Sequence, residues 1–175
     1  NPGQIAGIEK RYSTVSLGAE RKLVKKTLLH RLFGIGSIPR KLRPVIEKEG
    51  IVVSDEGIGG WFVTKRVNAP GKRYLNRSEG FTGCFAITKE RVVCYTYWKR
   101  QINISIRDPK IPDLYVDVPK EQTFSVSFES SVFREGWEGV IEFRFDTEKA
   151  HLFRDALVSI GAQQGAATDA DKPRR

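Results

Sequence analysis

The sequence predicts a mainly β domain: a partly open barrel of about seven antiparallel strands, capped by a C-terminal α-helix and preceded by a helical extension. Three observations predict this fold. Four segments after residue 100 alternate apolar and polar side chains with a period of two. One apolar stripe at helical spacing follows the last of them. Apolar residues make up 39% of the 175-residue chain, which is enough for a core.

The composition divides the chain into three parts. Residues 1–38 form a basic extension with a helix, residues 39–161 form the barrel domain with its terminal helix, and residues 162–175 form a tail that we expect to be disordered. No apolar run approaches the roughly 18 residues that a bilayer-spanning helix needs. We therefore expect a cytoplasmic protein, with peripheral attachment to the inner face of the membrane as one option.

The extension contains one clear helical pattern, over residues 19–33. Val24, Leu28 and Leu32 recur at every fourth position and form an apolar stripe. The other face carries four basic residues: Arg21, Lys22, Lys25 and Lys26. This pattern is typical of a helix that lies on a membrane surface, although its stripe fits packing on the barrel or on another chain equally well. Glycines end the pattern, and a short basic helix over residues 40–48 is expected to follow.

The early strands follow the extension. We expect them at residues 51–53, 61–67, 81–87 and 91–98. The first two flank a glycine-rich segment, residues 55–60, which predicts a turn. A basic loop over residues 68–73 contains a Pro-Gly turn, and the polar residues 88–90 form a connector of hairpin length.

The late strands have the cleaner alternation. Their apolar members are Ile102, Ile104, Ile106, Leu114, Val116, Val118, Phe124, Val126, Phe128, Ile141, Phe143 and Phe145. Polar side chains between them predict antiparallel strands with one face on a core and the other in water.

The last element changes its period. Residues 147–160 place Ala150, Phe153 and Leu157 on one apolar stripe of a helix about 21 Å long. Asp146 is expected to cap its N-terminus, and a glycine follows its C-terminal end. This helix is long enough to cover one opening of a small barrel.

Two stretches carry a resemblance to a known family. GCFAITKERVVCYTYW resembles the central hairpin of the GRAM and bacterial pleckstrin-homology-like families, and GVIEFRFDTEKAHLFRDAL resembles their last strand and C-terminal helix. The resemblance covers residues 45–160. It implies two near-orthogonal antiparallel sheets that form a partly open barrel with the helix at one end. It also implies that a basic loop between early strands meets anionic lipid head groups.

Five cations gather where that loop is expected. They are Lys65, Arg66, Lys72, Arg73 and Arg77, and no acidic residue lies among them. Arginine offers a planar fork to phosphate and lysine a point charge, so an anionic lipid is the predicted ligand. The close Lys-x-Arg arrangement of strong phosphoinositide binders is missing, which favours loose electrostatic attraction. A solvated basic hairpin is the alternative.

Catalytic and metal-binding signatures are absent from the sequence. Two histidines and two cysteines have no spacing typical of zinc ligands, and no phosphate loop, GxSxG or HExxH motif occurs. The segment Gly57–Gly60 lacks the following Lys-Ser/Thr of a phosphate loop. We therefore expect a non-enzymatic binding module without cofactor or metal. Cys84 and Cys94 are expected to be reduced core residues, with a cross-hairpin disulfide as the alternative.

The charge distribution indicates the kind of partner. The net charge is +9, and two-thirds of the Lys and Arg residues lie in residues 1–100, whereas acidic residues outnumber basic ones after residue 100. This asymmetry favours an anionic partner, and solubility is the simpler reading. The leading hypothesis is peripheral association with anionic membrane. The alternative is a protein-interaction or oligomerisation module that uses a sheet edge or the N-terminal helix.

Nucleic acid is the partner we do not favour. Lys99 and Arg100 follow Tyr95, Tyr97 and Trp98, and basic residues beside aromatic ones are typical of single-strand binding. Alternation sends these aromatic side chains to both faces of the strand, so at least one face is expected to be core.

Overall fold

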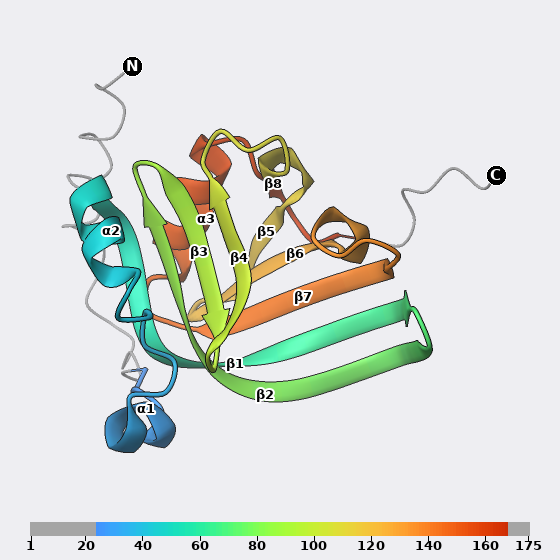
Figure 1. Cartoon of the computed structure of the whole chain (residues 1–175), viewed down its shortest axis with the longest axis horizontal. Coiled ribbons are helices and arrows are strands. Elements are labelled where there is room, and N and C mark those ends of the chain that lie inside the picture. The colour runs from blue at the N-terminus through green and yellow to red at the C-terminus, as the bar shows by residue number, and fades with distance from the viewer. Residues whose placement is uncertain (1–23, 168–175) are drawn as a thin grey trace.

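The computed structural model describes residues 24–167, and its centre is one continuous curled sheet (Figure 1). The strands are β1 Ile51–Ala69, β2 Lys72–Thr88, β3 Arg91–Thr96, β4 Lys99–Ser105, β5 Tyr115–Lys120, β6 Thr123–Glu129, β7 Glu138–Asp146 and β8 Gln163–Gln164. The helices are α1 Leu28–Phe33, α2 Arg43–Glu49 and α3 Ala150–Ser159, with short 3₁₀ turns η1 Ile111–Asp113 and η2 Ser130–Val132. The prediction of a mainly β, barrel-like fold with a helix after the long strands is confirmed.

The sheet has the strand order β4-β3-β2-β1-β7-β6-β5-β8. All neighbours pair antiparallel except β5 and β8, which run parallel. Because β1 and β2 are long and bend, the sheet turns from the β2–β4 side to the β5–β7 side and encloses a core between them (Figure 1).

The predicted turn at residues 55–60 is wrong, because β1 runs straight through it. Gly57 has φ +66°, and the register with β2 shifts between Glu56 and Ile58, so this glycine forms a bulge rather than a reversal. A Cβ at Gly60 would lie 2.2 Å from the carbonyl oxygen of Arg144, so only glycine lets β1 pass this close to β7. The glycines therefore bend the strand without ending it.

The expected basic loop at residues 68–73 is also mostly strand. Ala69 pairs with Lys72, which leaves Pro70-Gly71 as the turn. Strand β3 pairs with β2 only from Gly83 to Ile87. Residues 72–82 of β2 therefore have β1 on one side and no strand on the other within the described chain. The part of the β1–β2 hairpin around the Pro70-Gly71 turn, which we call the wing, extends beyond the barrel (Figure 1).

The core lies between the curled sheet and α3. The predicted apolar stripes of β5, β6 and β7 point into it, and Phe124, Phe143 and Phe145 are almost fully buried. Phe153 of α3 is fully buried, with its ring centroid 5.3 Å from those of Phe85 and Phe124. The terminal helix thus covers one side of the half-barrel, as its apolar stripe predicts.

The boundaries of α3 differ from the expected helix 147–160. The cap residue is Lys149, not Asp146, and its side chain makes no capping hydrogen bond. The hydroxyl of Thr147 accepts from the backbone N–H of Lys149 at 3.1 Å and donates to Asp55 at 2.6 Å. This buried threonine fixes the link between β7 and α3, which delays the start of the helix.

The N-terminal helix is also shorter than the expected 19–33. In its described part, helix α1 begins at Leu28, because the Thr27 side chain accepts from the N–H of His30 at 3.2 Å and caps it. The backbone N–H of Thr27 donates to the carbonyl of Gly57 at 2.9 Å. This bond holds the residue before α1 against β1 in an extended conformation. Residues 19–23 lie outside the described chain.

A second apolar cluster joins α2 to the outer face of the sheet. It contains Ile38, Ile46, Cys84, Ala86 and Val93. An ion pair between Glu49 and Arg91 lies beside it. The chain from Ile38 onward is therefore packed on the sheet.

The segment after α3 continues with ordered pairing. Strand β8 pairs with β5, and the N–H of Ala167 donates to the Ser127 hydroxyl at 2.9 Å. The expected disordered tail at residues 162–175 thus contains six described residues, 162–167, that run along the sheet. The rest of the expected tail lies outside the described chain.

The two cysteines are free and lie on opposite faces of the sheet. Cys84 belongs to the outer cluster, whereas Cys94 belongs to the main core. A disulfide between them is excluded because adjacent strands present these side chains in opposite directions. Burial raises the pKa of Cys84 to about 12 and also raises that of Cys94. Neither thiol is a ready nucleophile.

Candidate functional site

The basic residues expected on β1 and β2 fall into two groups, paired and unpaired. Lys65 belongs to the first, because its ammonium lies 3.0 Å from Glu142 on β7. Arg144 donates two hydrogen bonds to the same carboxylate, at 2.7 and 3.1 Å. Burial alone would raise the pKa of Glu142, but the hydrogen bonds from Arg144 and Lys65 outweigh it and hold the pKa below its ordinary value.

Arg77 and Arg66 are also engaged. The Arg77 guanidinium pairs with Glu79 on the same strand and lies 5.8 Å from the ring centroid of Tyr74. Arg66 is exposed and has φ +49°, at a point where the register between β1 and β7 shifts. Its backbone carbonyl lies against Gly139. Arg66 and Arg77 thus take part in contacts within the sheet.

Lys72 and Arg73 differ from the other three. Both are exposed, and neither forms an ion pair with any described residue. They follow the Pro70-Gly71 turn directly, so they lie at the tip of the wing (Figure 1). Of the five predicted cations, these two are the best placed to meet an external anion.

The four cations expected on the N-terminal helix do not lie together on a helix in the described chain. Arg21 and Lys22 lie outside it. Lys25 is exposed and precedes α1, and Lys26 contacts the Asp55 carboxylate and the Glu56 carbonyl. Lys26 therefore attaches the residues before α1 to β1, whereas the Lys25 side chain faces solvent.

Helix α1 exposes its apolar side chains. Leu28, Leu32 and Phe33 are 66%, 64% and 71% exposed, and no residue of the helix is buried. Lys25 and Arg31 lie next to them in the chain and are exposed as well. The helix thus presents apolar and basic side chains to solvent together.

Helix α1, with the basic residues beside it, and the wing tip lie far apart along β1. Helix α1 is anchored beside Gly57, and the strand runs twelve more residues to Ala69, about 40 Å at roughly 3.3 Å per residue. They do not converge on one pocket. Both lie along the lower margin of the molecule in Figure 1, with the bend of β1 and β2 between them.

The turn between β3 and β4 meets this bend. The hydroxyl of Tyr97 donates to the carbonyl of Gly80 at 2.8 Å, and its N–H donates to Thr82 at 2.6 Å. Trp98 is next in the chain and is 74% exposed. The indole stands at the turn, with Lys99 and Arg100 following it.

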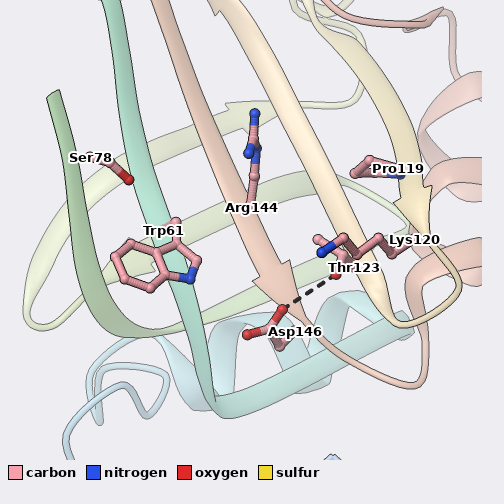
Figure 2. Close-up of a pocket in the computed structure, with 7 residues that line it drawn as sticks. All are labelled: Trp61, Ser78, Pro119, Lys120, Thr123, Arg144 and Asp146. Carbon is pink, nitrogen blue, oxygen red and sulfur yellow. Dashed lines mark hydrogen bonds between the residues drawn. The ribbon is translucent and has the colours of Figure 1, made fainter. Parts of the chain in front are cut away.

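A shallow pocket lies on the opposite face of the sheet from the core (Figure 2). Its volume is about 380 Å³, and its lining comes from five strands. Trp61 and Ser78 line one side, Lys120 and Thr123 the other, and Arg144 and Asp146 lie between them. Trp61 is 52% exposed. Register explains the placement, because Trp61 pairs with Arg144 and their neighbours Phe62 and Phe143 point into the core.

Sequence reasoning did not single out Trp61. Its position in a strand was expected. Whether its ring is covered depends on the residue that pairs with it on β2, which is Gly80. That pairing depends on the bulge at Gly57, whose effect on register a local pattern does not reveal. Trp98, by contrast, stands beside two basic residues in the sequence, and this signal is local.

Neither metal binding nor membrane spanning finds support among residues 24–167. They hold no group of three or more His, Cys, Asp or Glu side chains placed to bind a metal ion. No helix in this part of the chain is long and apolar enough to cross a bilayer.

No family model and no curated protein matches the chain.

Proposed function

We propose that the protein is a non-enzymatic, pleckstrin-homology-like module that associates peripherally with anionic membrane through its basic N-terminal and early-strand surfaces. The observation that carries the proposal is helix α1, which leaves Leu28, Leu32 and Phe33 bare beside Lys25 and Arg31. Apolar side chains with flanking cations favour the interface of an anionic bilayer. The proposed location is the cytoplasmic face of the membrane.

The lower margin in Figure 1 supports a single orientation on a membrane. It carries α1 at one end and the tip cations Lys72 and Arg73 at the other. Trp98 stands at the turn near the bend between them, and indole rings favour the head-group level of a bilayer. Each Lys or Arg near an anionic leaflet contributes about 1 kcal/mol. Several weak contacts along one margin would together hold the domain on the surface.

The pleckstrin-homology-like assignment is supported only by how the sheet and its terminal helix are arranged. A sheet that curls around a core, with a helix following its last long strand, is what the resemblance of residues 45–160 implies. The finer description, two near-orthogonal sheets closed at one end by the helix, remains part of the proposal. No step of catalysis is assigned to any residue.

Co-sedimentation with vesicles tests the function. The protein should bind phosphatidylcholine vesicles that contain phosphatidylserine, bind pure phosphatidylcholine vesicles much less, and lose binding as salt rises. The variant Leu32→Ser/Phe33→Ser should bind at least tenfold more weakly. Leu152→Ser is the control, because Leu152 is an exposed leucine on α3. Equal binding to both vesicle types would refute the proposal.

A second candidate is favoured by the unpaired edge of β2. Residues 72–79 have no strand on their outer side within the described chain, and an exposed edge can accept an extended peptide or a second copy of the chain. Leu75 on this edge is 65% exposed. Three cations along it would favour an acidic partner.

Size-exclusion chromatography over a range of concentrations tests the oligomeric form of this second candidate. A dimer that dissociates in the variant Asn76→Pro would support edge pairing, because proline removes a donor from the strand. A protein that stays monomeric while binding anionic vesicles would favour the membrane function.

A further inference from the structure

The pocket in Figure 2 has a lining that neither the core nor the proposed membrane surface requires. Its residues come from β1, β2, β5, β6 and β7 and point away from the core. A volume of about 380 Å³ lies within the range of small-ligand sites. The pocket is open to solvent, so a ligand can enter without a change in the fold.

One wall of the pocket is a bare aromatic ring. Trp61 pairs with Gly80 across β1 and β2, and a Cβ built on Gly80 would lie 4.0 Å from Cζ3 of the indole. Any larger side chain at Gly80 would lie against the ring. Glycine therefore leaves the indole available to an apolar ligand face.

The charges around the pocket nearly balance. Arg144 donates two hydrogen bonds to Glu142, a carboxylate that it shares with Lys65 outside the pocket lining. Lys120 contributes one positive charge and Asp146 one negative charge, and both side chains are exposed. The lining and its ion-pair partners therefore keep at most one net positive charge.

The polar groups of the pocket supply both donors and acceptors. Asp146 accepts a long hydrogen bond of 3.4 Å from the Thr123 hydroxyl and keeps further acceptor capacity. Lys120 forms no ion pair with a described residue and keeps its three donors. Hydroxyl groups on a ligand can use both kinds of partner, because a hydroxyl donates and accepts.

From these observations we infer that the pocket binds one neutral sugar ring. A pyranose has an apolar C–H face that fits against Trp61 and hydroxyl groups that fit between Lys120 and Asp146. A flat apolar wall and mixed donors and acceptors are the two properties that it needs. The inference is independent of membrane binding, because none of these residues belongs to the surface proposed for it.

The test is an NMR titration of the ¹⁵N-labelled chain, with the indole N–H of Trp61 as the reporter. The probes are the methyl glycosides of glucose, galactose, mannose and N-acetylglucosamine, with choline phosphate and inorganic phosphate as charged comparisons. We expect at least one glycoside to shift the Trp61 signal at millimolar concentration and to leave the Trp98 signal unchanged. Both charged probes should leave Trp61 unshifted.

Two variants sharpen the test. Trp61→Ala should weaken glycoside binding at least tenfold, followed through neighbouring backbone amides, whereas Trp98→Ala, which removes the other highly exposed indole, should not change it. Asp146→Asn should weaken binding severalfold with an unchanged melting temperature. The inference is overturned if no glycoside shifts Trp61, or if phosphate or choline phosphate shifts it more than every glycoside does. Vesicle binding by Trp61→Ala should stay normal, so failure here and failure of the membrane proposal are distinguishable.

Discussion

Helices α1 and α3 carry similar amphipathic patterns and have opposite surroundings. In α3, Phe153 and Leu157 are fully buried against the sheet. In α1, Leu28 and Leu32 are about two-thirds exposed, and no residue of the helix is buried. The difference teaches that a helical apolar stripe predicts a face that favours burial but does not say what covers it.

The cause lies in what each helix meets. Helix α3 follows β7 directly and lies over the open side of the half-barrel, where the rings of Phe85 and Phe124 complete its packing. Helix α1 is held by a backbone bond to Gly57 and by Lys26 on Asp55, contacts that use none of its apolar side chains. No described residue buries its apolar stripe.

The largest effect, a loss of folding stability, is expected from a substitution on the buried face of α3. Phe153→Asp places an unpaired charge in the core and removes a large ring, so we expect a loss of at least about 3–5 kcal/mol and an unfolded domain. Urea unfolding followed by circular dichroism measures it. Leu152→Asp, on the exposed side of α3, should change stability by less than about 0.5 kcal/mol. A folded Phe153→Asp domain would contradict the description of α3 as part of the core.

Substitutions on the exposed apolar face of α1 should weaken membrane binding and leave folding unchanged. Leu32→Ser/Phe33→Ser removes two exposed apolar side chains, so the free energy of unfolding should stay within about 0.5 kcal/mol. Binding to anionic vesicles should fall at least tenfold, since each apolar side chain of this size contributes about 1.5–3 kcal/mol when fully buried. Thermal melts and vesicle co-sedimentation give the two readouts. If the variant melts much earlier, α1 is packed on the domain and the comparison with α3 fails.

The same contrast applies to the cations of the wing. Lys72→Ala/Arg73→Ala removes two unpaired charges and should weaken vesicle binding by about 1 kcal/mol per residue at low salt. Lys65→Ala is the matched control, because Lys65 is already paired with Glu142. It should lower stability slightly and change binding less. Equal losses of binding for both variants would mean that pairing does not decide which cations meet the membrane.

The smallest effect concerns the pH dependence of the Glu142 pair. The pKa of Glu142 is lower in the folded state than in the unfolded chain, so its contribution is present above the unfolded pKa and is lost as the pH falls through the folded value. Wild type should exceed Glu142→Gln by about 1 kcal/mol at neutral pH. The gap should shrink as the pH falls below about 4. Urea titrations at several pH values measure it, and a gap that is constant with pH would show that the carboxylate charge is not what stabilises the pair.

Much of the architecture could be predicted because its signals are local. Alternation located the core faces of β5 to β7, and helical spacing identified Phe153 as a core residue. The turn expected at residues 55–60 was wrong because glycine is used there for a bulge and a close approach to β7, and composition alone does not distinguish these from a reversal.

The candidate sites were harder to predict. The five early-strand cations look equivalent in the sequence, but β7 brings Glu142 to Lys65 and leaves Lys72 and Arg73 without an acidic neighbour among the described residues. The pocket at Trp61 depends on five strands that are far apart in the chain. No pattern within one segment contains such information.

By itself, the sequence determined the β class, the positions of the late strands and the terminal helix along the chain, and the excess of positive charge in the first hundred residues. These follow from periodicity and composition, which act over a few neighbouring residues. Only the tertiary structure decided which apolar stripe is covered, which cations are paired and where Trp61 is bare. Each of these depends on the partner across a strand pair or beneath a helix, and register over long sequence separations sets that partner.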